Sequence, residues 1–75
     1  MSPRKPRLVP AAEFLARAMA DDAWALLMDE GVPATLEHTP RSFGQGGYTR
    51  LFVPEGDLEI AQRLIEPIVA RDRSS

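Results

Sequence analysis

A helix that turns directly into an extended segment is the feature that most constrains how this chain can fold. Apolar residues recur at helical spacing up to Leu27, and Gly31 follows them. Glycine tolerates the positive φ angle that commonly ends an α-helix. Pro33 then prevents helical continuation and favours an extended conformation at Val32. Apolar residues alternate from there to Leu36, which is the period of a half-buried strand. The chain therefore contains an α-to-β corner.

Size and composition indicate one small globular domain. The chain has 75 residues, of which 44% are hydrophobic and 27% are charged, and a domain of this size buries only about 60% of its unfolded surface. It has no cysteine, which excludes disulfides, thiolate metal sites and cysteine nucleophiles and fits a reducing compartment. No apolar run approaches the roughly 20 residues of a membrane span, and no signal peptide is recognisable. We therefore expect a cytoplasmic protein.

The charge of the chain is unevenly placed. Arg4, Lys5 and Arg7 are positive, and the whole chain has a formal net charge of −2, so the 68 residues after Arg7 carry −5. We expect residues 1–7 to form a flexible basic tail, because they are rich in proline and charge. A nucleic-acid-binding domain usually has a basic folded surface, and here the folded part is acidic. Nucleic acid is therefore an unlikely partner, and only the tail favours it.

The clearest strand covers residues 48–54. Thr49, Leu51 and Val53 are expected on one face, with alternate residues on the other. A turn then leads to Asp57, which is a good N-cap for a second helix. Pro67 leaves two alternatives for that helix, which either ends near residue 66 or kinks and continues. Residues 71–75 are expected to fray.

Residues 8–14 have two interpretations. Helix propensity alone would extend the first helix backward to Ala11. As a strand, Leu8, Pro10, Ala12 and Phe14 would share one face, and the proline would restrict the strand to an edge. With a strand here, residues 8–70 form one α+β domain. Its order is that of a ferredoxin-like or PII-like βαββα(β) two-layer sandwich, with parallel first and second strands and both helices on one face of a small sheet.

The helix corner and the second half of the chain resemble a known family. Leu27, Gly31, Val32, Pro33 and Ala34 match its pattern Leu-x-x-x-Gly-Ile-Pro-Ala, with valine in place of isoleucine. Its pattern Leu-x-Val-Pro-x-x-Asp is matched by Leu51, Val53, Pro54 and Asp57. The chain thus resembles the small bacterial DUF2007 family, described as prokaryotic signal-transducing proteins. The resemblance implies a strand at residues 8–14, since an extended segment precedes the first helix in that family. It implies no catalytic residues, because both motifs are structural.

The loop at residues 38–47 is the first candidate for a binding site. Its glycines could expose backbone N–H groups to an anion, beside arginine side chains. The surrounding pattern of a phosphate-binding loop is absent, so a plain flexible loop is the competing interpretation. The candidate ligand-binding residues are His38, Arg41, Gly44, Gly46, Gly47, Tyr48 and Arg50.

The second candidate is a protein-interaction surface on the uncovered sheet face and beside the first helix. Trp24 and Met28 lie at the margin of the buried helix face, and aromatic residues of the strands lie on the open sheet face. The candidate residues are Phe14, Trp24, Met28, Tyr48 and Phe52. Such a face often meets another copy of the same chain, so a homodimer through it is expected alongside an unknown protein partner.

No catalytic or metal centre is indicated by the sequence. His38 is the only histidine, and the acidic residues of the first helix are typical of a solvated face. No nucleophile–base pair can be assembled, so we expect a protein without enzymatic activity, metal or cofactor. The expected function is a small regulatory or protein-interaction module. The alternatives are a sensor of small anions that uses the glycine-rich loop, and a nucleic-acid accessory protein that uses the basic tail.

Overall fold

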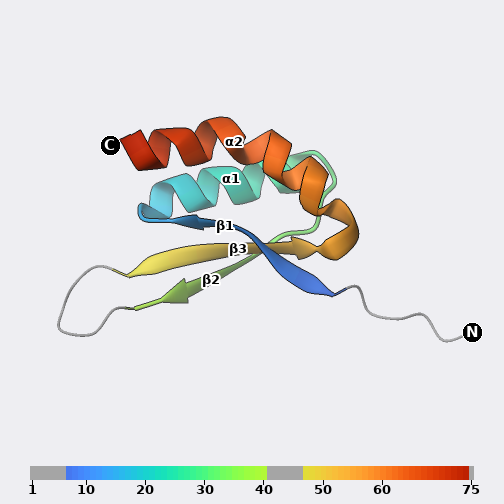
Figure 1. Ribbon diagram of the computed structural model, residues 1–75, viewed down its shortest axis with the longest axis horizontal. Coiled ribbons are helices and arrows are strands. Elements are labelled where there is room, and N and C mark those ends of the chain that lie inside the picture. The colour runs from blue at the N-terminus through green and yellow to red at the C-terminus, as the bar shows by residue number, and fades with distance from the viewer. Residues whose placement is uncertain (1–6, 41–46, 75) are drawn as a thin grey trace, which may run out of the picture.

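The computed structural model describes residues 7–40 and 47–74, which form an α+β fold of three strands and two helices (Figure 1). The elements are β1 (Leu8–Phe14), α1 (Arg17–Asp29), β2 (Thr35–Thr39), β3 (Tyr48–Pro54), the short 3₁₀ turn η2 (Glu55–Asp57) and α2 (Leu58–Ser74). This order of strands and helices is the expected one. The strand at residues 8–14 is confirmed, although helix propensity alone favoured a longer first helix.

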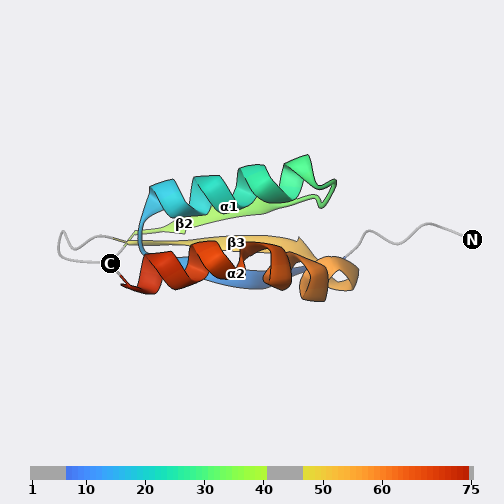
Figure 2. The ribbon, with the colours of Figure 1, turned by 90° about the horizontal axis from the view of Figure 1, so that it is seen from above.

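The three strands form one antiparallel sheet in the order β1-β3-β2. Both outer strands are antiparallel to β3, so β1 and β2 run parallel to each other, as predicted. Both helices lie on the same side of the sheet (Figure 1). Seen from above, α1 runs along the β2 side and α2 along the β1 side (Figure 2). The described part of the chain is therefore two layers, with one sheet face covered by helices.

The C-terminal end of α1 is closed by backbone hydrogen bonds of its own segment. Gly31 has φ of +83°, its N–H bonds the carbonyl of Met28 at 3.1 Å, and the Val32 N–H bonds the carbonyl of Leu27 at 2.8 Å. This pair of bonds is the Schellman motif. Leu27 and Val32 are both buried, which supplies the hydrophobic contact that accompanies the motif. The glycine signal in the sequence is therefore confirmed.

The strand after this corner is displaced from its expected position. β2 begins at Thr35 and ends at Thr39, so Val32 precedes the strand, and His38 belongs to the strand rather than to the loop. Leu36 pairs with Leu51 of β3, and His38 pairs with Thr49. A strand after the corner was correctly predicted, but it begins at residue 35 rather than at residue 32, because its ladder starts only where β3 is available to pair.

A β-bulge in β1 corrects the predicted placement of Phe14. The register shifts between Pro10 and Ala12, which leaves one extra residue in β1 and moves the later residues to the opposite face. Phe14 consequently pairs with Thr49 on the helix-covered face and is fully buried. It is a core residue and does not belong to the open sheet face. A strict two-residue alternation could not foresee this.

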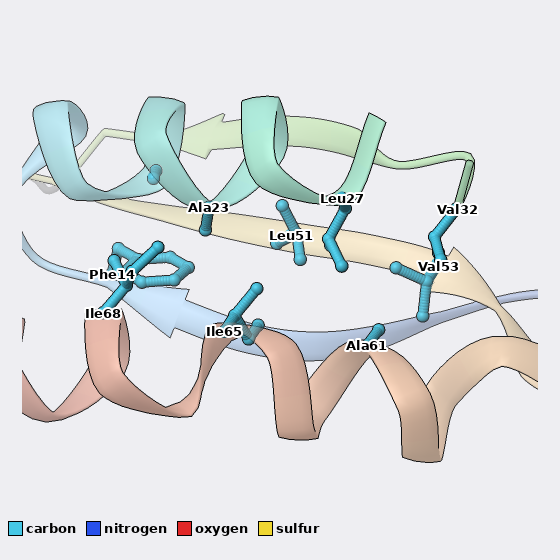
Figure 3. Packing of buried hydrophobic residues seen from close by; sticks show 10 residues of the cluster. Phe14, Ala23, Leu27, Val32, Leu51, Val53, Ala61, Ile65 and Ile68 are labelled. Atoms are coloured by element: carbon cyan, nitrogen blue, oxygen red, sulfur yellow. The ribbon is translucent and has the colours of Figure 1, made fainter. Parts of the chain in front are cut away.

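The core lies between the sheet and the two helices (Figure 3). Its side chains come from β1, α1, β3 and α2, and one more comes from the corner between α1 and β2. They are Phe14, Ala20, Ala23, Leu27, Val32, Leu51, Val53, Ala61, Ile65 and Ile68. Alanines on α1 and α2 let the helices approach the sheet closely, and the larger side chains of β1 and β3 fill the space between them.

The C-terminal helix is longer than expected. α2 continues past Pro67 to Ser74, so the helix does not end near residue 66, and residues 71–74 are helical. Ala61, Ile65, Ile68 and Asp72 share the buried stripe of this helix. Asp72 is 3% exposed, and its contacts to the start of α1 hold the last turn of α2 against the domain.

Candidate functional site

The sheet face that no helix covers is the main exposed feature of the described fold. Leu51 and Val53 of β3 are buried under the helices, so the alternate residues Tyr48, Arg50 and Phe52 point to the opposite side. The open face consists of these three residues and their register partners on the outer strands: Pro10, Glu13, Thr35, Glu37 and Thr39. Tyr48 and Phe52 are half-buried. The predicted alternation of β3 is confirmed.

Charged and aromatic side chains form a row across the middle of the open face. Arg50 lies opposite Glu13 on one side and Glu37 on the other. Its Nε lies 3.3 Å from Glu13 Oε2, and its guanidinium carbon lies 5.3 Å from the centre of the Tyr48 ring. Each contact contributes only about 0.5–1 kcal/mol at an exposed position. Together they hold the guanidinium close to Glu13 and Tyr48.

The predicted anion-binding residues do not converge. His38 pairs with Thr49, and its Nδ1 lies 3.3 Å from the Thr49 hydroxyl oxygen. That places the imidazole on the helix side of the sheet, whereas Tyr48 and Arg50 lie on the open face. The predicted loop residues Arg41, Gly44 and Gly46 lie outside the described residues. The described residues therefore contain no cluster of His38, Tyr48 and Arg50 that could hold one anion.

Gly47 has a structural reason to be glycine. A side chain there would collide with the backbone carbonyl oxygen of Thr39 and would lie 2.8 Å from the Cα of Pro40. The absence of a Cβ lets the ends of β2 and β3 approach each other. This contact explains the residue without any ligand.

The predicted interaction residues of α1 are exposed, as expected. Trp24 is 39% exposed and Met28 47% exposed. The Trp24 indole Nε1 donates a hydrogen bond to the carbonyl oxygen of Ala34 at 2.9 Å. Trp24 therefore ties α1 to the residue just before β2, so the indole has a structural role at the margin of the buried helix face. Its remaining exposed surface lies beside the β2 edge, apart from the open face.

Catalytic chemistry finds no support in the described residues. The nearest approach to a nucleophile–base pair is the contact between Thr49 and His38, but Thr49 is 4% exposed and its hydroxyl is closed to a substrate. In the ranges 7–40 and 47–74, no group of three or more histidine or acidic side chains could hold a metal ion. No helix among the described residues is long and apolar enough to cross a membrane.

A groove of about 380 Å³ lies between β1 and α2. Its floor is apolar, and side chains of both charges surround it. The lining includes Ala11, Ala12, Ile65 and Val69, together with Glu13, Glu59, Gln62, Arg63, Glu66 and Arg73. The Gln62 amide nitrogen donates to the carbonyl oxygen of Ala11 across the groove at 3.4 Å. Sequence reasoning missed this groove because it depends on how α2 packs beside β1.

Asp72 was also missed. Its carboxylate accepts the N–H of Leu15 at 2.8 Å and the N–H of Ala16 at 2.9 Å, at the start of α1. A signal for it was present in the sequence, since Asp72 continues the apolar stripe of α2 at helical spacing from Ala61 and Ile68. An acidic residue in such a stripe requires hydrogen-bond donors from another element.

Comparison with known proteins gives no relative for this chain: no family model, no curated protein and no solved structure shows a significant match.

Proposed function

We propose that this protein is a small, non-catalytic interaction module that binds a partner protein through its open sheet face. The observation that supports this proposal most directly is that both helices cover the same side of the sheet (Figure 1). The other side presents Tyr48 and Phe52 on either side of the charged row that Glu13, Arg50 and Glu37 form. Aromatic side chains surrounded by polar ones are typical of protein-binding surfaces. We further propose that the fold is a ferredoxin-like domain of the DUF2007 type that acts in the cytoplasm.

The charges of the open face favour a partner with basic residues. The face carries Glu13, Glu37 and Arg50, and only Glu13 forms an ion pair with Arg50 among the described residues. Face-to-face packing of two copies would enclose four carboxylates and only two guanidinium groups, and buried charges without partners are costly. A partner that brings Lys or Arg to Glu37 compensates this charge. A second copy on this face, which the sequence suggested, is therefore less favoured.

The alternative functions have less support. An anion sensor needs His38 on the same side as Arg50, but His38 contacts Thr49 on the helix side, and Arg50 is already paired with Glu13. A nucleic-acid accessory role rests on Arg4, Lys5 and Arg7, of which only Arg7 is among the described residues. The carboxylates of the open face would also repel phosphates.

Site-specific photo-crosslinking in the producing cells tests the proposal. A photoreactive amino acid at position 52 is expected to give a discrete crosslinked product. The same amino acid at Asp21, which is exposed on α1, should give none. Adding Glu37→Arg to the position-52 variant should abolish the product, because it removes the charge that attracts the partner.

Several results would contradict the proposal. These are equal crosslinking at positions 52 and 21, no crosslinking at either, or a product that persists with Glu37→Arg. A product of twice the chain mass would identify a second copy as the occupant of the open face and would overturn the assignment of a basic partner.

A further inference from the structure

We propose that a second copy of this chain binds at the β1 edge, with β1 antiparallel to β1 and α2 antiparallel to α2 across a twofold axis. This surface lies along the β1 edge and α2 and shares only Glu13 with the open face, so the inference goes beyond the function proposed above. β1 is an outer strand of the sheet, and the groove of about 380 Å³ lies directly beside it under α2. The dimer would have one continuous sheet with all helices on one side and both open faces on the other.

Two contacts define how β1 and α2 are aligned. Gln62 bonds the carbonyl of Ala11, and Asp72 bonds the N–H of Leu15. Strand and helix therefore run in the same direction. Four strand residues and ten helix residues span nearly the same length, about 14 Å, at the usual rises of 3.4 and 1.5 Å per residue. Ala12 consequently lies level with a point on α2 between residues 63 and 66.

This alignment makes the groove complementary to itself. A twofold axis through Ala12 places Arg63 of each copy opposite Glu66 of the other, so two attractive contacts form at once. Glu66 is exposed and forms no ion pair among the described residues. Arg63 is paired with Glu59 at 3.2 Å, with both side chains more than three-quarters exposed. Such a pair is weak, so Arg63 can turn toward the second copy at little cost.

The residues near the axis suit a close approach of two strands. Ala11 and Ala12 have small side chains, and they line the floor of the groove with Val69. Pro10 has no N–H to donate, so strand pairing is confined to residues after it. A second copy would replace the long bond from Gln62 to Ala11 with a backbone bond. Because this ladder of strand hydrogen bonds would be short, contact between the two α2 helices would supply the rest of the interface.

The other edge of the sheet is unsuited to a second copy. β2 has five residues with Glu37 at the centre, so antiparallel pairing of two β2 strands over their full length places the two Glu37 carboxylates directly opposite each other. Like charges at such positions are destabilising, and edge charges commonly prevent self-pairing. Among the described strands, charge therefore favours the β1 edge.

Charge exchange at the twofold axis tests this arrangement, with molar mass measured by light scattering over a range of concentrations. Wild type is expected at twice the mass of one chain. R63E alone and E66R alone should each weaken the dimer by about 100-fold or more, because each turns two attractive contacts into two repulsive ones. An equimolar mixture of R63E and E66R chains should form a heterodimer, because both contacts are attractive again.

Matched controls make the test specific to the β1–α2 groove. R17E and E30R introduce the same charge changes at exposed positions in the first turn of α1 and at its C-cap, and should leave the dimer intact. Phe52→Asp should also leave it intact, which separates this dimer from one formed through the open face. A monomeric wild type at millimolar concentration, a dimer unaffected by R63E and E66R, or a mixture that stays monomeric would each overturn the proposal.

Discussion

The two ends of α1 are held in different ways, and the difference shows which structural features a sequence reveals. At the C-terminal end, Gly31 and Val32 bond carbonyls only three to five residues earlier in the chain. At the N-terminal end, the first turn contains no acidic residue and Ala16 makes no side-chain cap. The carboxylate there comes from Asp72, which is 56 residues away from Ala16 in sequence. The first end is closed by local backbone geometry, and the second by tertiary packing.

Removing the distant carboxylate should have the largest effect. Asp72→Ala leaves the N–H groups of Leu15 and Ala16 without their acceptor and removes a negative charge from the start of α1. We expect a loss of about 3 kcal/mol in the free energy of unfolding, measured by urea denaturation. Asp72→Asn should lose less, because its amide oxygen can accept one of the two bonds. Asp29→Ala, at an exposed position, should change stability by less than about 0.5 kcal/mol. A smaller loss for Asp72→Ala than for Asp72→Asn would contradict this interpretation.

The C-terminal end of α1, which is closed by local backbone bonds, should be less sensitive to substitution. Gly31→Ala is expected to cost about 1 kcal/mol in the same assay, because alanine is strained at φ of +83°. A Cβ there would have no atom within 4 Å, so the cost is conformational and involves no collision. Gly56 provides the control, since a Cβ there also meets open space and its φ is not positive. Gly56→Ala should be neutral or slightly stabilising, and an equal loss at both glycines would refute the explanation.

Trp24 tests whether the local end also depends on tertiary contact. Trp24→Phe keeps most of the ring but removes the hydrogen bond to Ala34, the residue before β2. The expected loss is about 0.5–1 kcal/mol, because the bond is partly exposed to water. Hydrogen exchange should show faster opening of the amides of β2 than of β1. Uniform acceleration in both strands would mean that the indole does not specifically hold the corner.

The smallest expected effect is the coupling between the two ends. The double variant Asp72→Ala/Gly31→Ala should lose the sum of the two single losses within about 0.5 kcal/mol, because the sites lie at opposite ends of a 13-residue helix and share no contact. Adding R63E to each variant weakens the proposed dimer at the β1 edge and checks that assembly does not contribute. A coupling above about 1 kcal/mol would show that α1 transmits a distortion from one end to the other.

The residues of the open sheet face could be predicted from the sequence only where local strand geometry places them. The alternation of β3 depends only on strand geometry, so Tyr48, Arg50 and Phe52 were correctly placed on one face. Phe14 was wrongly placed there, because the bulge between Pro10 and Ala12 changes the face of the residues after it. His38 was grouped with the loop, although the ladder of β2 extends through it. Each error lies where pairing with β3 decides the position of a side chain.

The sequence by itself determined the features that depend on neighbouring residues: the helix that ends at Gly31, the alternation of β3 and the apolar stripe of α2. It determined these because backbone dihedral angles, caps and face periodicity depend on residues only a few positions apart. Only the tertiary structure decided that residues 8–14 form a strand, that a bulge buries Phe14, and that Asp72 closes the start of α1 and orders the last turn of α2. These features require hydrogen-bond partners from distant segments, and such partners become available only when the elements pack together.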